Sequence, residues 1–197
     1  MDDAVGEALD KTARLLNCNW SESGGLGKEL EKIASRGKPL QLNINILSNY
    51  KDPLSFSFSG LKTALKLFIL DENNFSTSQE DLAATIQDTL FGHLVDRVKN
   101  CFELLQNCNL NIKTLSLIGG VASNNYLRSS LKNLCKKFDV TLVSPEPSLC
   151  TDNAIMIGLA ANKMFSDSKG QLPISMPSRI NPEWNIEELI INKSTLE

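Results

Sequence analysis

Apolar side chains recur at helical spacing along much of the chain, and this periodicity predicts several helices. The first is expected to be capped by Asp2 or Asp3 and to end near Leu16. Others are expected over residues 29–35, 60–70 and 79–105, the last being long and amphipathic. Residues 17–28 contain Gly24, Gly25 and Gly27 and are predicted to form a loop.

A second pattern, strict alternation of apolar and polar residues, predicts a half-buried strand over residues 54–59, and a further strand is expected over residues 40–46. The last third of the chain then alternates between the two kinds of element. We expect a strand over residues 114–118, a turn over 119–124, a helix over 125–137, a strand over 140–143 and a helix over 153–164. Such alternation is typical of an α/β fold.

Composition narrows the class of protein. The 197 residues are 42% hydrophobic and 22% charged with a net charge of −3, which excludes disordered, collagen-like and coiled-coil chains. The single His excludes a site that needs two from this chain, such as H-E-x-x-H. Five Cys without a C-x-x-C pair indicate free thiols in a reducing compartment. No apolar run is long enough for a membrane span, so no membrane partner is expected.

The most informative local feature is the pair Gly119 and Gly120, which joins a predicted strand to a predicted helix. Paired glycines let a ligand approach the backbone, and a helix N-terminus favours anions. The spacing fits neither G-x-G-x-x-G nor a Walker A loop, so contact with a phosphate or nucleotide and a simple tight turn are equally good interpretations. Asn124 can either bind a ligand or cap the helix.

Two carboxylates are further candidates. Asp10 lies beyond the first turn of its predicted helix, where the benefit from the helix dipole has faded, and ribose hydroxyls are natural partners for it. Thr151 and Asp152 precede a predicted helix, and we favour capping there over ligand contact. Asp152 could donate one carboxylate to a metal ion, but a single ligand does not make a site.

The remaining polar residues have simpler interpretations. Arg128, Lys132 and Lys136 recur on one helix face, where a solvated surface is favoured over a track for RNA phosphates. His93 is expected to be a core or boundary residue. No G-x-S-x-G motif and no Cys/His couple supports covalent hydrolysis.

Four segments together, at residues 2–14, 56–64, 119–128 and 150–157, resemble one family. They read DDAVGEALDKTAR, FSFSGLKTA, GGVASNNYLR and CTDNAIMI. In this order they resemble the tRNA threonylcarbamoyladenosine synthases, also known as the glycoprotease-like or O-sialoglycoprotein-endopeptidase-like family. The resemblance covers the chain from Asp2 to about Trp184.

The resemblance implies the actin-like ATPase fold of sugar kinases and heat-shock ATPases, with two α/β lobes around a nucleotide cleft. It implies transfer of a threonylcarbamoyl group from threonylcarbamoyl-AMP to the adenosine 3′ of the anticodon in tRNA. Because the adenylate is a mixed anhydride with AMP as its leaving group, the task is largely positioning and charge stabilisation. The ligands implied are tRNA, threonylcarbamoyl-AMP or ATP, and one divalent metal ion, iron or zinc.

By motif, the resemblance implies that Asp10 binds ribose, Gly25 lies against the nucleotide, Asn124 contacts the ligand and Asp152 ligates the metal. A nucleotide-binding Glu follows the glycine pair in the family, and the longer loop here leaves Glu29 and Glu31 as alternatives. The family's H-x-x-x-H metal ligands and first phosphate loop are absent from these 197 residues.

We therefore expect the C-terminal portion of the family domain, lacking most of the first lobe. Residues 17–80 would form a partly helical insertion and residues 165–197 a C-terminal strap. Activity of such a chain is doubtful, and the alternative is a non-catalytic fragment that binds a nucleotide or a partner. A homodimer or a complex with other subunits is a further expectation. The loop around residues 20–23 and the relaxed motif spellings resemble a mitochondrial member of the family more than a bacterial or archaeal one. A mitochondrial location is therefore expected, with a cytoplasmic one as the alternative.

Overall fold

The computed structural model describes residues 3–20, 25–42, 53–71 and 76–167. The chain divides into two compact units, Met1–Asn153 and Ala154–Glu197. In the first unit the elements are α1 (Val5–Leu15), α2 (Gly25–Ala34), α3 (Ser59–Leu70), α4 (Gln79–Asn107), β1 (Thr114–Ser116), η2 (Gly120–Ser123), α5 (Asn125–Lys137), β2 (Thr141–Val143) and η3 (Pro147–Leu149). In the second unit the structure describes α6 (Ala154–Asp167).

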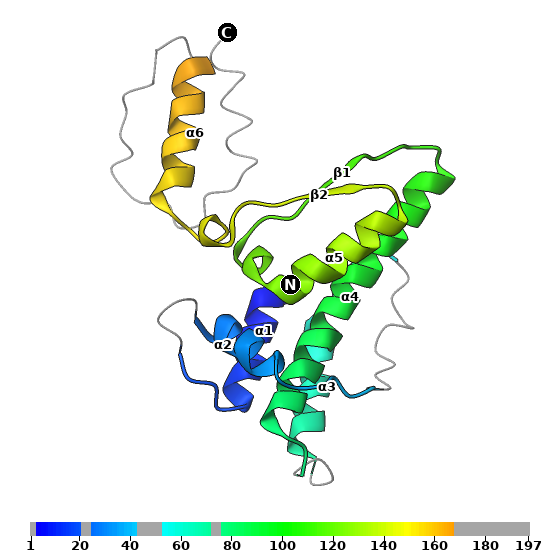
Figure 1. Ribbon diagram of the computed structural model, residues 1–197, viewed down its shortest axis with the longest axis vertical. Coiled ribbons are helices and arrows are strands. Elements are labelled where there is room, and N and C mark those ends of the chain that lie inside the picture. Colours follow the sequence, from blue (N-terminus) through cyan, green and yellow to red (C-terminus); the bar gives the residue numbers. More distant parts are fainter. Residues whose placement is uncertain (1–2, 21–24, 43–52, 72–75, 168–197) are drawn as a thin grey trace. The chain divides into compact units, whose positions relative to one another are not determined.

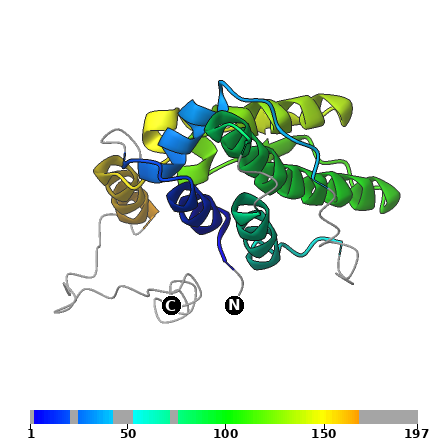
Figure 2. The ribbon, with the colours of Figure 1, turned by 90° about the horizontal axis from the view of Figure 1, so that it is seen from below.

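Helix α4 is the centre of the first unit, and α1, α2, α3 and α5 all pack against it (Figures 1 and 2). It begins where the Ser78 hydroxyl accepts a hydrogen bond from the Asp81 N–H at 3.1 Å, an ordinary N-cap. Its apolar stripe includes Ile86, Leu90 and Phe91, all fully buried. The long amphipathic helix predicted over residues 79–105 is therefore confirmed, and the core forms around it.

The two strands form a small parallel sheet in which Thr114, Leu115 and Ser116 face Thr141, Leu142 and Val143. Helix α5 connects them, so β1, α5 and β2 make one strand–helix–strand crossover. The structure is thus mostly helical with a small parallel sheet, as in part of an α/β fold. The helix and both strands of this segment lie where the sequence predicts them.

Two predictions about the first two helices are wrong. Ala4 is the N-cap of α1 and makes no side-chain cap, while Asp3 forms ion pairs with Lys11 and Lys62 instead of capping. Helix α2 begins at Gly25, inside the predicted loop, because Leu26 and Leu30 are buried in the core.

The strand predicted over residues 54–59 does not form, and α3 begins at Ser59. Its alternation has another cause: the Ser57 N–H donates to Nε2 of His93 at 3.3 Å, and Phe58 is buried. The predicted burial of His93 is confirmed, with 3% of it exposed. Of the strand predicted over residues 40–46, residues 43–46 lie outside the described part of the chain.

Helix α6 extends three residues beyond the predicted end at Met164, so the first part of the expected strap is helical. Residues 168–197 lie outside the described residues. Within its own unit α6 exposes large apolar side chains: Ile155, Met156, Ile157, Leu159, Met164 and Phe165. No helix among the described residues is long and apolar enough to cross a membrane.

Candidate functional site

The N-terminal part of α1 lies against the glycine turn that follows β1. A Cβ atom added to Gly6 would lie 3.2 Å from Cγ2 of Val121, so the backbone of α1 approaches η2 closely. Gly119 has a φ of +90° in this turn, a backbone conformation that residues with a Cβ rarely adopt. The turn predicted between residues 119 and 124 is therefore confirmed, and α1 packs beside it.

Asp10 and Gly25 lie on neighbouring helices of the same region. The half-buried Asp10 places Oδ1 3.8 Å from the position of a Cβ added to Gly27, so its carboxylate lies beside the first turn of α2. Gly25 opens that helix with φ of +71°, and the indole of Trp20 lies 3.6 Å from its Cβ position. Trp20 itself is 69% exposed. The structure thus brings a carboxylate, an open backbone and an exposed aromatic ring to one helix start.

Asn124 caps α5, which was one of the two interpretations left open by the sequence. Its Oδ1 accepts from the Leu127 N–H and its Nδ2 donates to Oε1 of Gln87, each at 3.1 Å. Asn124 and Gln87 are 7% and 4% exposed. Gln87 was missed by sequence reasoning, although a polar residue next to the buried stripe of α4 is the signal that could have found it.

Glu31, rather than Glu29, reaches the end of the glycine turn. Its Oε1 accepts from the Asn125 N–H at 2.8 Å, and its Oε2 pairs with Lys28 at 2.9 Å. Glu29 pairs with Lys32 at 3.5 Å on the same helix. Glu31 therefore ties α2 to the N-terminus of α5.

Tyr126 fixes the other side of this helix start. Its hydroxyl donates to Oδ1 of Asp88 at 2.5 Å, and its ring stacks on Phe91 with centroids 6.4 Å apart. Burial, reinforced by the hydrogen bond to the Asp88 carboxylate, raises the pKa of Tyr126 to about 12. Helix α4 therefore holds the first turn of α5 through two contacts with Tyr126, the ring of Phe91 and the carboxylate of Asp88.

Arg128 is not on a solvated face, which corrects the sequence prediction for that residue. Its Nε donates to the carbonyl oxygen of Ala122, and its Nη2 donates to the carbonyl oxygen of Pro145 at 2.6 Å. The same Nη2 lies 3.2 Å from Sγ of the buried Cys150. Arg128 thus joins the glycine turn to the segment that leads to Asp152.

Asp152 is exposed, and the described residues contain no group of three or more His, Cys, Asp or Glu that could hold a metal ion. His93 is buried beside α3, where it contacts the rings of Phe56 and Phe58. A metal bound at Asp152 would need ligands that the described residues do not supply. The described residues alone therefore do not fit a metal centre.

Comparison with known proteins relates the chain to a family that is described as tRNA-modifying transferases. The model of the family described as TsaD, tRNA N6-adenosine threonylcarbamoyltransferase, matches residues 1–159. The chain belongs to this family, as the four motifs of the sequence predict.

Curated relatives carry the same description. A tRNA N6-adenosine threonylcarbamoyltransferase of Wolbachia sp. subsp. Brugia malayi is 35% identical over 94% of this chain and 52% of its own length. That of Orientia tsutsugamushi (strain Boryong) is 36% identical over 96% of this chain and 55% of its own. A probable mitochondrial member from Arabidopsis thaliana is 32% identical over 96% of this chain and 41% of its own. The chain therefore spans about half the length of the curated relatives it matches.

Proposed function

We propose that this chain provides the adenylate-binding part of tRNA threonylcarbamoyl transfer. The observation that carries the proposal is the convergence of two motif segments, residues 2–14 and 119–128, with helix α2: Gly6 of α1 lies against Val121, Asp10 against Gly27, and Glu31 against the N–H of Asn125. These contacts join residues far apart in the sequence into one surface. Family membership supplies the ligand that such a surface would take.

In this proposal Asp10 accepts hydrogen bonds from ribose hydroxyls, and Gly25 lets the nucleotide approach the backbone of α2. The exposed ring of Trp20 beside Gly25 offers an apolar face to the adenine. The Nδ2 of Asn124 carries two hydrogens: one is donated to Gln87, and in this proposal the other is donated to the ligand. The exocyclic amine of the tRNA adenosine attacks the carbamoyl carbon, the C–O bond of the mixed anhydride breaks, and AMP departs with the bonding electron pair. The amine gives up one proton to water.

The metal ion, iron or zinc, is a separate part of the proposal. Asp152 would contribute one carboxylate ligand, and the ion would polarise the threonylcarbamoyl-phosphate end of the substrate. Because the described residues do not complete a coordination sphere, no step of the transfer is assigned to the metal.

The larger context is proposed on the same basis. We take the described part to be a portion of the actin-like ATPase fold, with the nucleotide cleft bordered by η2 and α2. The partners are tRNA and threonylcarbamoyl-AMP, with a homodimer or other subunits of a complex completing the cleft. A mitochondrial location is supported by the Arabidopsis relative, whose description names that organelle.

A non-catalytic fragment that binds a nucleotide or a partner is the second candidate. Two observations favour it: Asn124 already caps α5, and the described residues form no metal cluster. A transfer assay separates the two candidates. Incubation of the chain with labelled threonylcarbamoyl-AMP and unmodified tRNA gives labelled tRNA if the chain is a transferase, and AMP binding without labelling if it is not.

The site itself is tested by calorimetric titration with AMP. Asp10→Asn is expected to weaken binding at least tenfold, because a charge-assisted hydrogen bond becomes a neutral one. Asp96→Asn, an exposed carboxylate on α4, is the matched control and should leave binding unchanged. Equal affinities of the two variants would contradict the role given to Asp10.

A further inference from the structure

A basic groove runs between α5 and β2. It is a cavity of about 490 Å³ lined by Asn125, Arg128, Ser129, Lys132, Cys135, Lys136, Val140, Thr141, Leu142 and Ser144. Arg128 is held by backbone carbonyls, whereas Lys132 and Lys136 are exposed. No Asp or Glu lines the groove, so its positive charge is not neutralised from within.

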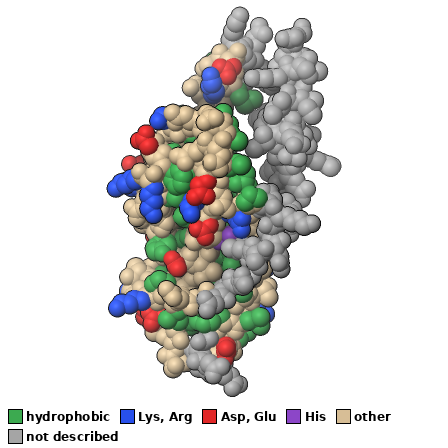
Figure 3. Space-filling view, turned by 90° about the vertical axis from the view of Figure 1, so that its right-hand side faces the viewer, with side chains coloured by type: hydrophobic (Ala, Val, Ile, Leu, Met, Phe, Trp, Pro, Cys, Tyr) green, Lys and Arg blue, Asp and Glu red, His purple; other side chains and the backbone are tan. Residues whose placement is uncertain are grey.

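The lysines of this groove differ from most others on the described surface. Ion pairs hold Lys11, Lys28, Lys32, Lys62, Lys99, Lys113 and Lys163 to carboxylates. On the face drawn in Figure 3, basic and acidic side chains lie intermixed. Among the described residues Lys132 and Lys136 have no such partner, although the protein carries a net charge of −3. The helix dipole stabilises the charge of Lys136 in the last turn of α5, but Lys132 lies a turn earlier, where this stabilisation is small.

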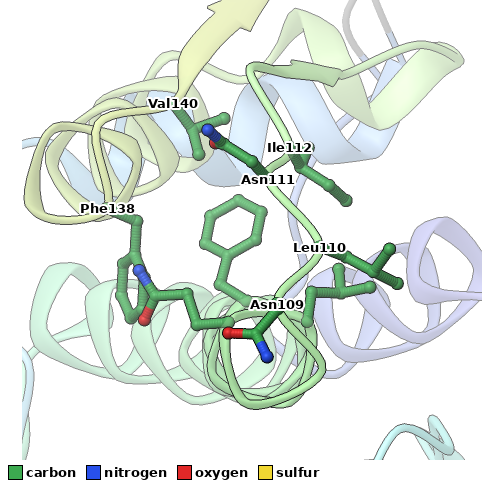
Figure 4. A pocket seen from close by; sticks show the side chains of 9 residues that line it. Asn109, Leu110, Asn111, Ile112, Phe138 and Val140 are labelled. Carbon is green, nitrogen blue, oxygen red and sulfur yellow. The ribbon is translucent and has the colours of Figure 1, made fainter.

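A second cavity of about 300 Å³ adjoins the groove, and Val140 lines both. It lies between the C-terminal ends of α4 and α5 and holds no charged residue: Phe102, Leu105, Gln106, Asn109, Leu110, Asn111, Ile112, Phe138 and Val140. Figure 4 shows Phe138 on one side of the cavity and Leu110 on the other, with Asn109 and Asn111 between them at its rim. The rings of Phe102 and Phe138 form its wall, with centroids 5.2 Å apart.

The two cavities together match the chemistry of an RNA strand. Lysines beside hydroxyls and amides suit phosphate oxygens, which take up most of the hydrogen bonds in protein–nucleic acid contacts. Aromatic rings with neighbouring carboxamides suit an unstacked base, since Asn and Gln carry both donors and acceptors for a base edge. A charged groove that leads to an aromatic pocket is the arrangement found in single-strand binding.

We propose that this surface binds RNA outside the adenylate site, with Lys132 and Lys136 on the phosphates and one unstacked base in the pocket of Phe102 and Phe138. The proposal rests on the proposed function in one respect, that the RNA is tRNA. Helix α5 connects the two sites: its first turn borders the adenylate site and lines the start of the groove, and its last turn leads to the base pocket. At about 1.5 Å per residue, its 13 residues span about 20 Å, a distance that one folded RNA bridges easily.

The test is the salt dependence of tRNA binding by the full chain, measured by fluorescence anisotropy with a labelled, unmodified transcript. Lys132→Ala with Lys136→Ala removes two phosphate contacts and should reduce the slope of log K against log salt by about 1.4, the value for single strands. Lys66→Ala with Lys99→Ala is the matched control, since it removes the same charge from exposed sites on α3 and α4 and should leave the slope unchanged.

A second variant tests the base pocket. Gln106→Ala with Asn111→Ala removes two exposed carboxamides and should weaken binding roughly tenfold at every salt concentration without changing the slope. All of these side chains are exposed, so circular dichroism and thermal midpoints should match the parent chain. ATP and inorganic phosphate serve as competitors, and efficient competition by either would reassign the groove to small phosphates.

The outcomes separate the two proposals. If the parent chain binds tRNA and the lysine and carboxamide variants bind equally well, the surface is not the RNA site, while tRNA as substrate stands. If the parent chain does not bind tRNA, both this inference and the tRNA part of the proposed function are overturned. AMP binding lost in Asp10→Asn but retained in the lysine variant would keep the two sites distinct.

Discussion

The contact between the end of α2 and the start of α4 predicts a large effect of a single methyl group. A Cβ atom added to Gly37 would lie 2.0 Å from the carbonyl oxygen of Glu80 and 2.6 Å from the N–H nitrogen of Asp81. These neighbours are backbone atoms of a helix start and cannot move aside as a side chain can. Gly37→Ala therefore has to separate the two segments.

That separation costs specific bonds. The Lys38 N–H donates to Oδ1 of Asp81 at 2.7 Å, and the Leu40 N–H donates to Oγ1 of Thr85 at 2.9 Å. Losing both costs about 2 kcal/mol, at about 1 kcal/mol each. Overpacking adds about 1–3 kcal/mol, so the free energy of unfolding should fall by about 3–5 kcal/mol. This is a large fraction of the roughly 5–15 kcal/mol that holds a typical domain together.

The control is another glycine-to-alanine change in the same helix bundle. Gly92 lies inside α4, and a Cβ there meets nothing within 4 Å. Gly92→Ala should raise the free energy of unfolding by roughly 0.8–1 kcal/mol through helix propensity alone. Urea unfolding followed by circular dichroism measures both. Equal midpoints for Gly37→Ala and the parent chain would refute the close approach of these segments.

A pH readout accompanies this prediction. The hydrogen bond from the Lys38 N–H holds the pKa of Asp81 below its usual range. A lowered pKa stabilises the fold above the carboxyl's ordinary pKa, and this contribution is lost as the pH falls through the folded value. In Gly37→Ala the pKa of Asp81 should return toward its ordinary value, which carbon-detected NMR titration measures.

Three further predictions follow from the site. Asn124→Ala should lower the free energy of unfolding by about 2–3 kcal/mol in urea titrations, because it removes the cap of α5 and the N–H donor to the buried Gln87. The control Asn133→Ala, on the exposed face of α5, should change the free energy of unfolding by less than about 0.5 kcal/mol. The parent chain should lose stability as the pH rises from about 10 to about 12, because the raised pKa of Tyr126 stabilises the fold only while the phenol stays protonated. Tyr126→Phe should remove this loss, and unfolding at stepped pH values compares the two chains. The purified chain should retain no stoichiometric iron or zinc by elemental analysis, and Asp152→Asn should not change its metal content.

Helix α5 shows how much local sequence can predict. Both of its ends were predicted because Asn124 is a good N-cap and its apolar stripe of Leu127, Leu131 and Leu134 keeps helical spacing. The strands β1 and β2 on either side were also predicted, because the whole crossover is contiguous in sequence. Local patterns are sufficient where capping, periodicity and packing all agree.

The errors arose where tertiary contacts decided the local structure. Gly25 and Gly27 suggested a loop, yet the burial of Leu30 outweighs the cost of two glycines in α2. Residues 54–59 alternate like a strand, but the Ser57 N–H bonds to His93 instead of a neighbouring strand. Propensity is a weak guide where the partner of a segment is distant in sequence.

The candidate site also contains some features that the sequence predicts and others that depend on tertiary contacts. Motif positions predict roles for Asp10, Gly25 and Asn124, and the structure adds how their surroundings hold them. The contact of Glu31 with the N–H of Asn125 joins residues 94 apart, and no local pattern could choose it over Glu29. Gln87 stands out in the sequence as a polar residue next to the buried stripe of α4, but its partner Asn124 is recognisable only once α4 and α5 are packed together.

The most direct test of the proposed adenylate site is a fluorescence titration that uses Trp20 as the reporter. The chain contains two Trp, so Trp184→Phe leaves Trp20, which lies 3.6 Å from the Cβ position of Gly25, as the single fluorophore. Titration with AMP should change its emission saturably, and Asp10→Asn in the same background should require at least tenfold more AMP. An emission spectrum that AMP leaves unchanged, or one that responds identically with and without the Asp10 carboxylate, would contradict the adenylate site.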